Sequence, residues 1–376
     1  MAPKRPKTSK SPSIFSSEFI IQNHSDIVSC VAMVFVVGLM FQATSRVAGL
    51  FVTLQYNQTV NDSANVEHIV YSTGSRDLFT VFFYFLICIV IHAVIQEYVL
   101  DKLNRKMHLS KIKHSKFNES GQLLVFSLVS AVWGANIFFR ENFVTSVNQL
   151  WEGYPHNNLS FSVKFFFIIQ LAYWLHNYPE LYLQKVRKEE IFGRLQYTTL
   201  YLIIISAAYF LNFTRVALCV LVLHYVVEFI YHVALLSHFS EKRDIASSIF
   251  TVFDIFFVVV RLGTITLAVL TFWYGLAQSS QPVIDVVAGN YNTYLIRINC
   301  LAALCLIQAG LMWNFITFHL RKWRENSGSS KRARSPVKKK TVKIAVVAAE
   351  ELEALPEVDQ NSATENGSLR ARKAKK

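Results

Sequence analysis

The sequence predicts an all-α polytopic membrane protein with eight transmembrane helices. Eight separate apolar stretches of about 18–25 residues occur in the 376-residue chain. At about 1.5 Å per residue, each is long enough to cross a hydrocarbon core of about 30 Å. Of the 38 Lys and Arg residues, 31 lie in segments that would share one side of such a membrane. Because backbone polar groups in lipid must be satisfied within their own segment, each stretch is expected to be a helix.

The first region of the chain contains two of these spans. Residues 1–26 form a basic, Pro- and Ser-containing tail that is expected to be disordered. The first span, Ile27–Phe51, starts too late and runs too long for a cleavable signal peptide, so it is expected to act as a signal anchor. A polar loop leads to the second span, Leu78–Tyr98, and a basic loop follows. We treat residues 27–115 as one region.

Six further spans follow with short connections, and residues 116–325 are expected to form a six-helix bundle. The spans are Gly121–Phe139, Phe161–Tyr178, Gln196–Phe213, Val216–Leu236, Ile249–Trp273 and Leu295–Phe318. The third and fourth of these are joined so tightly near Thr214 that they must form an antiparallel helical hairpin. Residues 326–376 carry Ser/Gly-rich, basic and acidic runs and are expected to be a disordered tail.

The distribution of basic residues predicts the orientation. Short cytosolic loops are enriched in Lys and Arg, so both termini are expected in the cytosol. The net charge of +13 is then a consequence of topology. Binding to a specific nucleic acid is the weaker interpretation, because the basic residues are dispersed among loops. All five cysteines fall within predicted spans, so structural disulfides are not expected.

Two glycosylation sequons lie in the first loop on the other side of the membrane. They are Asn57-Gln58-Thr59 and Asn61-Asp62-Ser63. The remaining sequons are predicted to be cytosolic or to lie against a membrane edge. We therefore expect a glycan on Asn57 or Asn61.

Three polar residues recur every four positions in the sixth span. His224, Glu228 and His232 should share one helical face. A charge at bilayer depth costs about 2.5–3.5 kcal/mol on insertion scales, so Glu228 should face other helices or a wet cavity. Three roles are open: a hydrogen-bonded stripe between helices, a polar lining for a guest peptide or lipid headgroup, and a metal site. Spacing over two turns makes a single metal ion the least favoured of these.

Two opposite charges lie in the seventh span. Asp254 and Arg261 are seven residues apart, so they share a face but are separated by about 10 Å. Each is therefore expected to pair with another helix, and Glu228 is the expected partner of Arg261. A structural ion pair is favoured over an ion pathway.

Several longer runs resemble a known family. They are Gln22–Cys30, Ile91–Tyr98, Lys113–Gln122, Gln170–His176, Tyr178–Tyr182, Val222–Phe229 and Arg321–Glu325. The four runs that lie between Lys113 and Phe229 are together similar to the TLC domain shared by the TRAM proteins, the Lag-type ceramide synthases and the CLN-type membrane proteins. The other three runs match the TRAM proteins. The resemblance covers about residues 20–325 and is closest to the TRAM family, the translocating chain-associating membrane proteins.

The resemblance implies a multi-pass protein of the endoplasmic reticulum membrane, with no cofactor, that assists protein translocation. Its implied partners are the Sec translocon, ribosome–nascent chain complexes, signal sequences and membrane lipids. A loose groove that is lined by aromatic and aliphatic side chains would suit such varied guests. Its expected polar residues are His176, His224, Glu228 and Arg261.

The same resemblance argues against catalysis. Lag-type synthases carry a His-His pair, and at the matching positions this chain has Gln196 and Tyr197. Neither side chain is a general base near neutral pH. In the second motif His224 matches, but Tyr225 and Glu228 stand where the synthases have aspartates. The alternative function is therefore a lipid-binding or sphingolipid-related protein of the TLC type, with or without activity.

Overall fold

The computed structural model describes residues 16–61, 67–143, 146–184, 186 and 188–332. Helices make up most of this part of the chain. The elements are, in order, α1 (Ser17–Gln22), α2 (His24–Gly38), α3 (Gln42–Val52), β1 (Asn57–Asn61), β2 (Glu67–Tyr71), α4 (Asp77–Ile95), η1 (Gln96–Leu100), α5 (Asp101–Met107), α6 (Lys111–Arg140), η2 (Val147–Leu150), α7 (Phe161–Leu183), α8 (Lys188–Phe210), α9 (Thr214–Phe239), α10 (Arg243–Ala268), η3 (Val269–Gly275), η4 (Leu276–Ser279) and α11 (Tyr294–Arg332).

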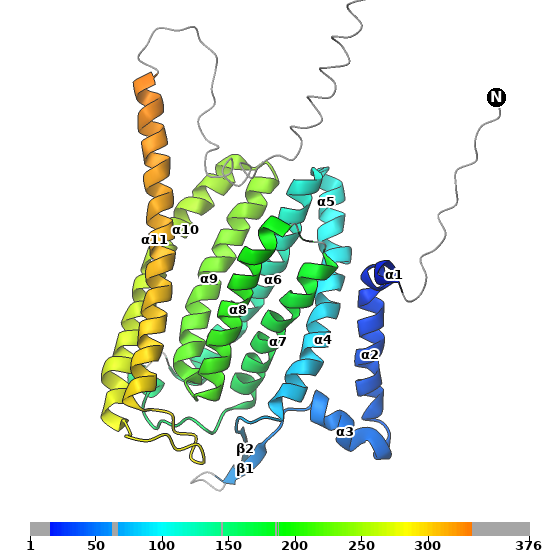
Figure 1. Cartoon of the computed structure of the whole chain (residues 1–376), viewed down its shortest axis with the longest axis vertical. Coiled ribbons are helices and arrows are strands. Elements are labelled where there is room, and N and C mark those ends of the chain that lie inside the picture. Colours follow the sequence, from blue (N-terminus) through cyan, green and yellow to red (C-terminus); the bar gives the residue numbers. More distant parts are fainter. Residues whose placement is uncertain (1–15, 62–66, 144–145, 185, 187, 333–376) are drawn as a thin grey trace, which may run out of the picture.

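Long helices stand side by side in one bundle (Figure 1). We call the end that carries β1 and β2 the hairpin end and the opposite end the α1 end. Within the described residues, six helices are long and apolar enough to cross a membrane. The prediction of an all-α polytopic membrane protein is thereby confirmed. The predicted number of eight spans is not, because α2 is shorter and α7 is not among the six.

The first predicted span is wrong as a single helix. The chain forms α2, breaks at residues 39–41, and continues as α3, which turns away along the hairpin end (Figure 1). The Thr44 hydroxyl donates to the carbonyl oxygen of Gly38 over 2.7 Å, and a Cβ at Gly38 would lie 3.2 Å from that of Ala48. A glycine and a short polar side chain therefore allow the corner. At about 1.5 Å per residue, α2 is only about 22 Å long.

The predicted tails are shorter than expected where they can be compared with the structure. Residues 17–22 form α1, and α2 already begins at His24, so a disordered segment as far as residue 26 is wrong. Helix α11 continues to Arg332, past the predicted start of the second tail at residue 326. Residues 1–15 and 333–376 lie outside the described residues.

The loop between α3 and α4 contains an antiparallel hairpin that the sequence analysis did not predict. Strand β1 pairs with β2 in a register that sets Asn57 opposite Tyr71. Tyr71 also exchanges backbone hydrogen bonds with Leu159, at 2.8 and 2.9 Å, in the segment that leads into α7. The hairpin is thus joined to the bundle rather than free.

The main core lies where α6, α7, α8 and α9 meet. Phe166 and Phe167 of α7 are fully buried, and Tyr225 of α9 is 1% exposed. The Tyr225 hydroxyl donates to Gln170, and the Trp174 indole N–H donates to Tyr225. Because lipid tails are as apolar as these side chains, close packing and internal hydrogen bonds rather than burial stabilise the contact.

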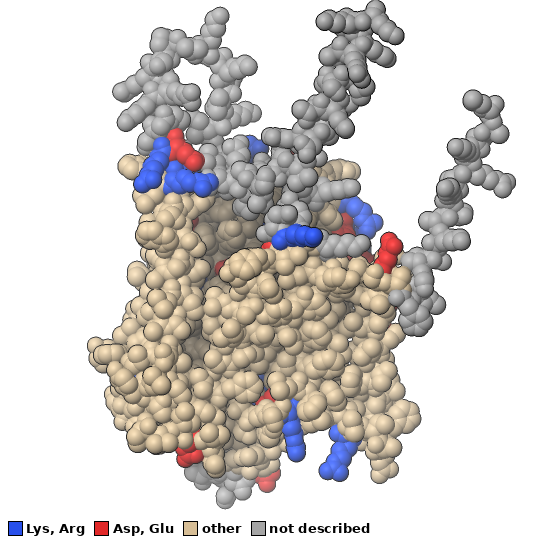
Figure 2. Space-filling view, in the orientation of Figure 1, with Lys and Arg blue, Asp and Glu red and all other residues tan. Residues whose placement is uncertain are grey.

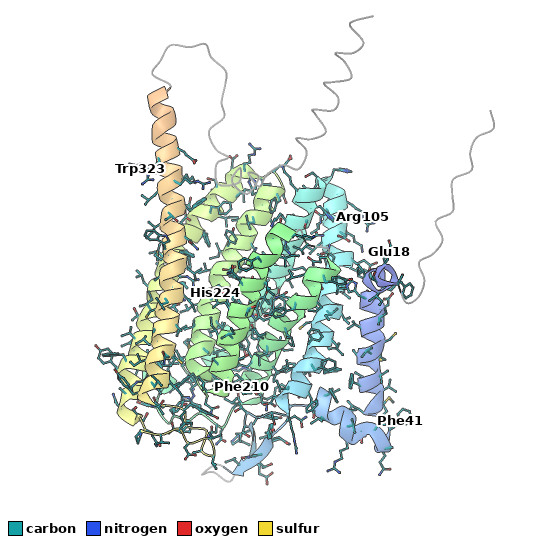
Figure 3. All side chains as sticks on the ribbon, in the orientation of Figure 1. Glu18, Phe41, Arg105, Phe210, His224 and Trp323 are labelled. Atoms are coloured by element: carbon teal, nitrogen blue, oxygen red, sulfur yellow. The ribbon has the colours of Figure 1, made fainter. Side chains whose placement is uncertain are left out.

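The outer surface has the charge distribution of a membrane protein. Figure 2 shows Lys and Arg side chains at the two ends, with a wide belt between them that carries few charged side chains. In Figure 3, Glu18, Arg105 and Trp323 lie toward the α1 end, whereas Phe41 and Phe210 lie toward the hairpin end. The long helices run through this belt. The side chains between them form the interior of the bundle.

Candidate functional site

The three polar residues of α9 form a stripe inside the bundle. The Nε2 atom of His224 lies 3.8 Å from Glu228 Oε1, and that of His232 lies 3.5 Å from Glu228 Oε2. His224 and His232 are 7% and 6% exposed, whereas the Glu228 side chain is 26% exposed. Four-residue spacing therefore brings the carboxylate between two imidazoles, as helical geometry requires.

Arg261 has different partners from the one expected. One of its terminal N–H groups donates to Gln308 Oε1 of α11 over 2.9 Å, and the other terminal nitrogen lies 3.2 Å from His224 Nδ1. The expected direct pair with Glu228 is wrong, since His224 stands between the two groups. The guanidinium also lies 5.0 Å from the centre of the Phe257 ring, a cation–π distance.

Helix α8 contributes a tyrosine to the same layer. The Tyr201 hydroxyl lies 2.5 Å from His224 Nε2, and its ring stacks on Trp174 of α7 with centroids 4.3 Å apart. We call Tyr201, His224, Arg261 and Gln308 the central polar layer. It joins α8, α9, α10 and α11 about halfway along the bundle, where His224 is seen in Figure 3. Tyr201 and Gln308 were not predicted from the sequence, because an uncharged Tyr or Gln in a span gives no sign of a buried polar contact.

His176 belongs to a separate cluster between α4 and α7. Its Nε2 atom lies 3.2 Å from His92 Nδ1, and His92 Nε2 lies 3.2 Å from Glu180 Oε1. Gln184 donates to Glu180 over 3.0 Å, and Gln122 of α6 donates to the His92 backbone carbonyl over 2.9 Å. The expected grouping of His176 with His224 is therefore not what the structure shows. His92 and Glu180 were missed, although both lie near the ends of spans.

Asp254 lies away from both clusters. Its carboxylate is 3.3 Å from His319 Nε2 of α11, and both side chains are more than one third exposed. The structure thus gives Asp254 and Arg261 separate partners on another helix. Asp254 and His319 line a cavity of about 300 Å³ between α9, α10 and α11 near the α1 end.

The two inner clusters meet at a cavity of about 420 Å³, which we call the polar cavity. Helices α4, α6, α7, α8 and α9 surround it. Its acidic, basic and imidazole lining residues are His92, Glu119, Glu180, Arg194, Glu228 and His232. No group of three or more His, Cys, Asp or Glu residues within the described segments could hold a metal ion. The metal interpretation of the α9 stripe therefore has no geometric support.

A third cavity, of about 170 Å³, lies on the hairpin side of the central polar layer between α8, α9, η3 and α11. We call it the apolar groove. Its lining is apolar and includes several small side chains, among them Ala207, Ala208, Ala217 and Ala303. Figure 2 shows the surface hollowed beside the column of α11. Small residues let another chain approach closely, so this groove suits an apolar guest.

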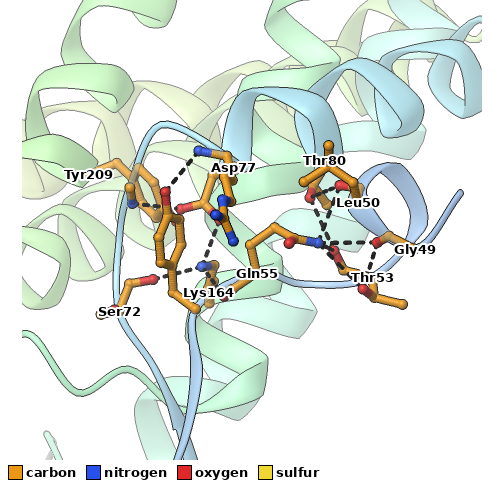
Figure 4. Close-up of polar contacts among 12 residues, drawn as sticks. Gly49, Leu50, Thr53, Gln55, Ser72, Asp77, Thr80, Lys164 and Tyr209 are labelled. Atoms are coloured by element: carbon orange, nitrogen blue, oxygen red, sulfur yellow. Dashed lines mark hydrogen bonds and ion pairs between the residues drawn. The ribbon is translucent and has the colours of Figure 1, made fainter. Parts of the chain in front are cut away.

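A buried ion pair near the hairpin end was also missed (Figure 4). Lys164 Nζ lies 2.7 Å from Asp77 Oδ1 and donates to the carbonyl oxygens of Gln55 and Ser72. The Tyr209 hydroxyl donates to Asp77 Oδ2 over 2.8 Å. Asp77 and Lys164 carry opposite charges close to the start of two predicted spans, and this pattern could have indicated the pair. This group ties α4, α7, α8 and the hairpin together.

The first glycosylation candidate is accessible in the structure. Asn57 is exposed at the start of β1. The side chain of Asn61 lies outside the described residues, although its backbone ends β1. A third sequon, at Asn212, is 2% exposed, and its amide donates to Asn157 and to Gly289. Burial thus leaves Asn57 as the better defined acceptor.

Comparison with known proteins identifies two levels of similarity. Residues 116–317 match the family model of the TLC domain. Translocating chain-associated membrane protein 2 of Mus musculus is 47% identical over 340 residues, which cover 90% of this chain and 91% of that protein. The same protein of Homo sapiens is 47% identical over 328 residues, 87% and 88% of the two chains.

A more distant similarity extends to enzymes. Ceramide synthase 5 of Homo sapiens is 25% identical over 150 residues, which cover 40% of this chain and 38% of the enzyme. The stretch matched to this enzyme is less than half of either chain. Gln196 is exposed on α8, while Tyr197 lines the polar cavity. The positions where the resemblance places a catalytic His-His pair therefore hold an amide and a phenol.

Proposed function

Because the chain belongs to the family of translocating chain-associated membrane proteins with a TLC domain, we propose that it assists translocation of nascent chains in the endoplasmic reticulum membrane. It would act beside the Sec translocon on secretory and membrane proteins. There it would contact signal sequences and transmembrane segments as they leave the channel. The support comes from the names and high identity of the two relatives and from the bundle of apolar helices.

The apolar groove is the structural observation that carries this proposal. An emerging signal sequence is apolar and varied in sequence, so its receptor must be apolar and tolerant. The groove has such a lining, and Ile203 on its rim is 60% exposed. The central polar layer closes the groove on one side and fixes α11 through the Arg261–Gln308 hydrogen bond. A guest helix would lie along α8 and α11, on the side of the bundle that faces the lipid.

We also propose that the hairpin end faces the lumen and that both termini are cytosolic. The distribution of Lys and Arg in the sequence supports this orientation. In the described residues, α1 and the C-terminal end of α11 lie at the same end of the bundle (Figure 1). Such an arrangement agrees with an even number of crossings.

We propose in addition that the protein does not catalyse acyl transfer. The amide of Gln196 and the phenol of Tyr197 support this, since neither replaces an imidazole as a base near neutral pH. Purified protein supplied with acyl-CoA and a sphingoid base should release no more free CoA than a detergent blank. Turnover above that blank would restore the enzymatic alternative.

The translocation role is tested with nascent chains. A secretory precursor that carries a photoreactive residue in its signal sequence is arrested on ribosomes bound to microsomes. Irradiation should yield an adduct that antibodies to this protein precipitate. A precursor whose signal sequence has its leucines replaced by serines is the control and should yield none. Failure to form any adduct with several signal sequences would refute the proposal.

A further inference from the structure

The polar cavity contains two carboxylates that no Lys or Arg neutralises directly. Glu180 lies on α7 and Glu228 on α9, and both line the cavity. Within the described segments, their ion-pair contacts are with His92, His224 and His232, and no Lys or Arg nitrogen lies within 4.0 Å of either. A carboxylate inside a helix bundle is costly unless a cation or several hydrogen-bond donors face it.

Some of the polar atoms in the cavity wall lack a hydrogen-bond partner among the described residues. Glu180 Oε2 and His232 Nδ1 are both in this state, and these residues are only 7% and 6% exposed. Buried polar atoms in proteins are nearly always hydrogen bonded. These two atoms, on two residues that line the same cavity, are groups that a polar ligand there would satisfy.

Aromatic side chains form another part of the cavity wall. Tyr173, Trp174, Tyr197 and Tyr231 line the cavity together with the two carboxylates. The faces of such rings attract cations, and aromatic walls combined with carboxylates recognise ammonium groups. The wall chemistry therefore favours a ligand that carries an ammonium group.

The opposite charge is provided by α8. Arg194 also lines the cavity, and its guanidinium donates to Glu119 and Glu190 through one terminal nitrogen. The Nε atom of Arg194 has no hydrogen-bond partner within the described residues. Guanidinium groups bind phosphate well, so one ligand that carries both a phosphate and an ammonium group matches both walls.

The position of the cavity indicates the source of that ligand. Glu228 lies 11 residues before the end of α9, which at about 1.5 Å per residue is about 16 Å from the α1 end. Glu180, three residues before the end of α7, and Arg194, six residues after the start of α8, lie only about 5 and 9 Å from the ends of their helices. The cavity therefore extends from the headgroup region into the upper acyl chains of one leaflet. We propose that the polar cavity binds the headgroup of a zwitterionic phospholipid, whose ammonium group faces Glu180 and Glu228 and whose phosphate faces Arg194. This lipid site is separate from the apolar groove and goes beyond assistance to nascent chains.

The proposal is tested by lipid binding to the purified full-length protein. The protein is depleted of lipid in detergent, and equal amounts of phosphatidylcholine, phosphatidylethanolamine and phosphatidylglycerol are added. Bound lipid is then counted by native mass spectrometry. The zwitterionic lipids should be retained about tenfold more than phosphatidylglycerol. Equal retention of the three lipids would overturn the proposal.

Variants locate the site. The double variant Glu180→Gln with Glu228→Gln should lower phosphatidylcholine retention to the level of phosphatidylglycerol. Asp244→Asn removes one carboxylate charge at an exposed position of α10 and should leave retention unchanged. Unchanged retention in the double variant would place the lipid elsewhere. If the double variant does not fold, as judged by gel filtration, the preference of the wild-type protein for zwitterionic lipids over phosphatidylglycerol still tests the proposal.

A polypeptide ligand is the competing outcome. A synthetic apolar peptide flanked by lysines brings a cation but no phosphate, so it should not displace bound phosphatidylcholine. Displacement of the lipid by this peptide at equal concentration would assign the cavity to a polypeptide and overturn the proposal.

Discussion

At the scale of single residues, the Lys164–Asp77 pair is the interaction whose loss should matter most for stability. Lys164 is fully buried and Asp77 is 1% exposed. Removing one partner of a buried pair leaves an uncompensated charge, which costs about 3–5 kcal/mol. We predict that Lys164→Met lowers the thermal unfolding midpoint in detergent far more than Arg46→Met, which removes an exposed cation.

A second variant separates lost charge balance from lost packing. Lys164→Met combined with Asp77→Leu removes both charges and should recover part of the lost stability, because an apolar pair leaves no unpaired ion. A double variant less stable than Lys164→Met alone would show that Asp77 acts through Tyr209 and Gly74 rather than through the lysine.

His156 should make the stability of the hairpin end depend on pH. Burial, together with the nearby Arg215 guanidinium, lowers the pKa of His156 to about 4 from its ordinary 6.5. The unfolded chain therefore binds this proton more readily than the folded protein between those two pH values. We predict that the free energy of unfolding falls by up to about 3 kcal/mol as the pH falls from 6.5 to 4.

The variant His156→Gln isolates this contribution. Its amide can still donate to the Glu152 carbonyl, which lies 2.9 Å from His156 Nε2, but it does not titrate. Thermal unfolding measured from pH 7 to pH 4 should show a shallower fall for the variant than for the wild type. Parallel curves would contradict the assignment.

Residue patterns predicted the α9 stripe but not its partners. Four-residue spacing sets the positions of His224, Glu228 and His232 within one helix, whatever the neighbouring helices do. The partner of Arg261 depends on how α10 and α11 pack, and an uncharged Gln308 is not visible as a partner from the sequence. The α9 stripe could therefore be predicted from the sequence of α9, but its contacts with the other helices could not.

At the scale of elements, apolar length predicted helices well and missed breaks. The residues around the α2–α3 corner, such as Met40 and Phe41, are as apolar as the helices themselves and are exposed. Composition thus carries no sign of the turn, which depends on Gly38 and Thr44. The β1–β2 hairpin was missed because its polar strands lie outside the apolar runs on which the prediction relied.

The hairpin should carry the glycan. Asn57 is exposed on β1, at the end of the bundle that we place in the lumen. We predict that Asn57→Gln removes a glycosidase-sensitive shift in gel mobility. The variant Asn61→Gln is tested beside it, because the sequence at Asn61 also satisfies the glycosylation motif. Asn366→Gln, a sequon in the second tail, is the control and should change nothing. A glycan that depends on Asn366 would show that the second tail lies in the lumen, which contradicts the proposed orientation.

At the scale of the whole molecule, the membrane class was predictable because it depends on how apolar and basic residues are distributed along the whole chain. Apolar runs and the side preference of Lys and Arg are summed over many residues, so local errors do not change the result. The polar cavity and the apolar groove were not predictable, because each is formed by side chains from four or five elements. Their position relative to the central polar layer depends on how the helices pack against one another.

The central claim is that a nascent apolar segment lies in the apolar groove. The most direct measurement places a photoreactive residue at Ile203 or Ala303, which line the groove, and at Val132 of α6 as a lipid-facing control that is 62% exposed. With arrested nascent chains in microsomes, the two groove positions should crosslink to the signal sequence and Val132 should not. Equal crosslinking from all three positions, or crosslinking from Val132 alone, would contradict the account.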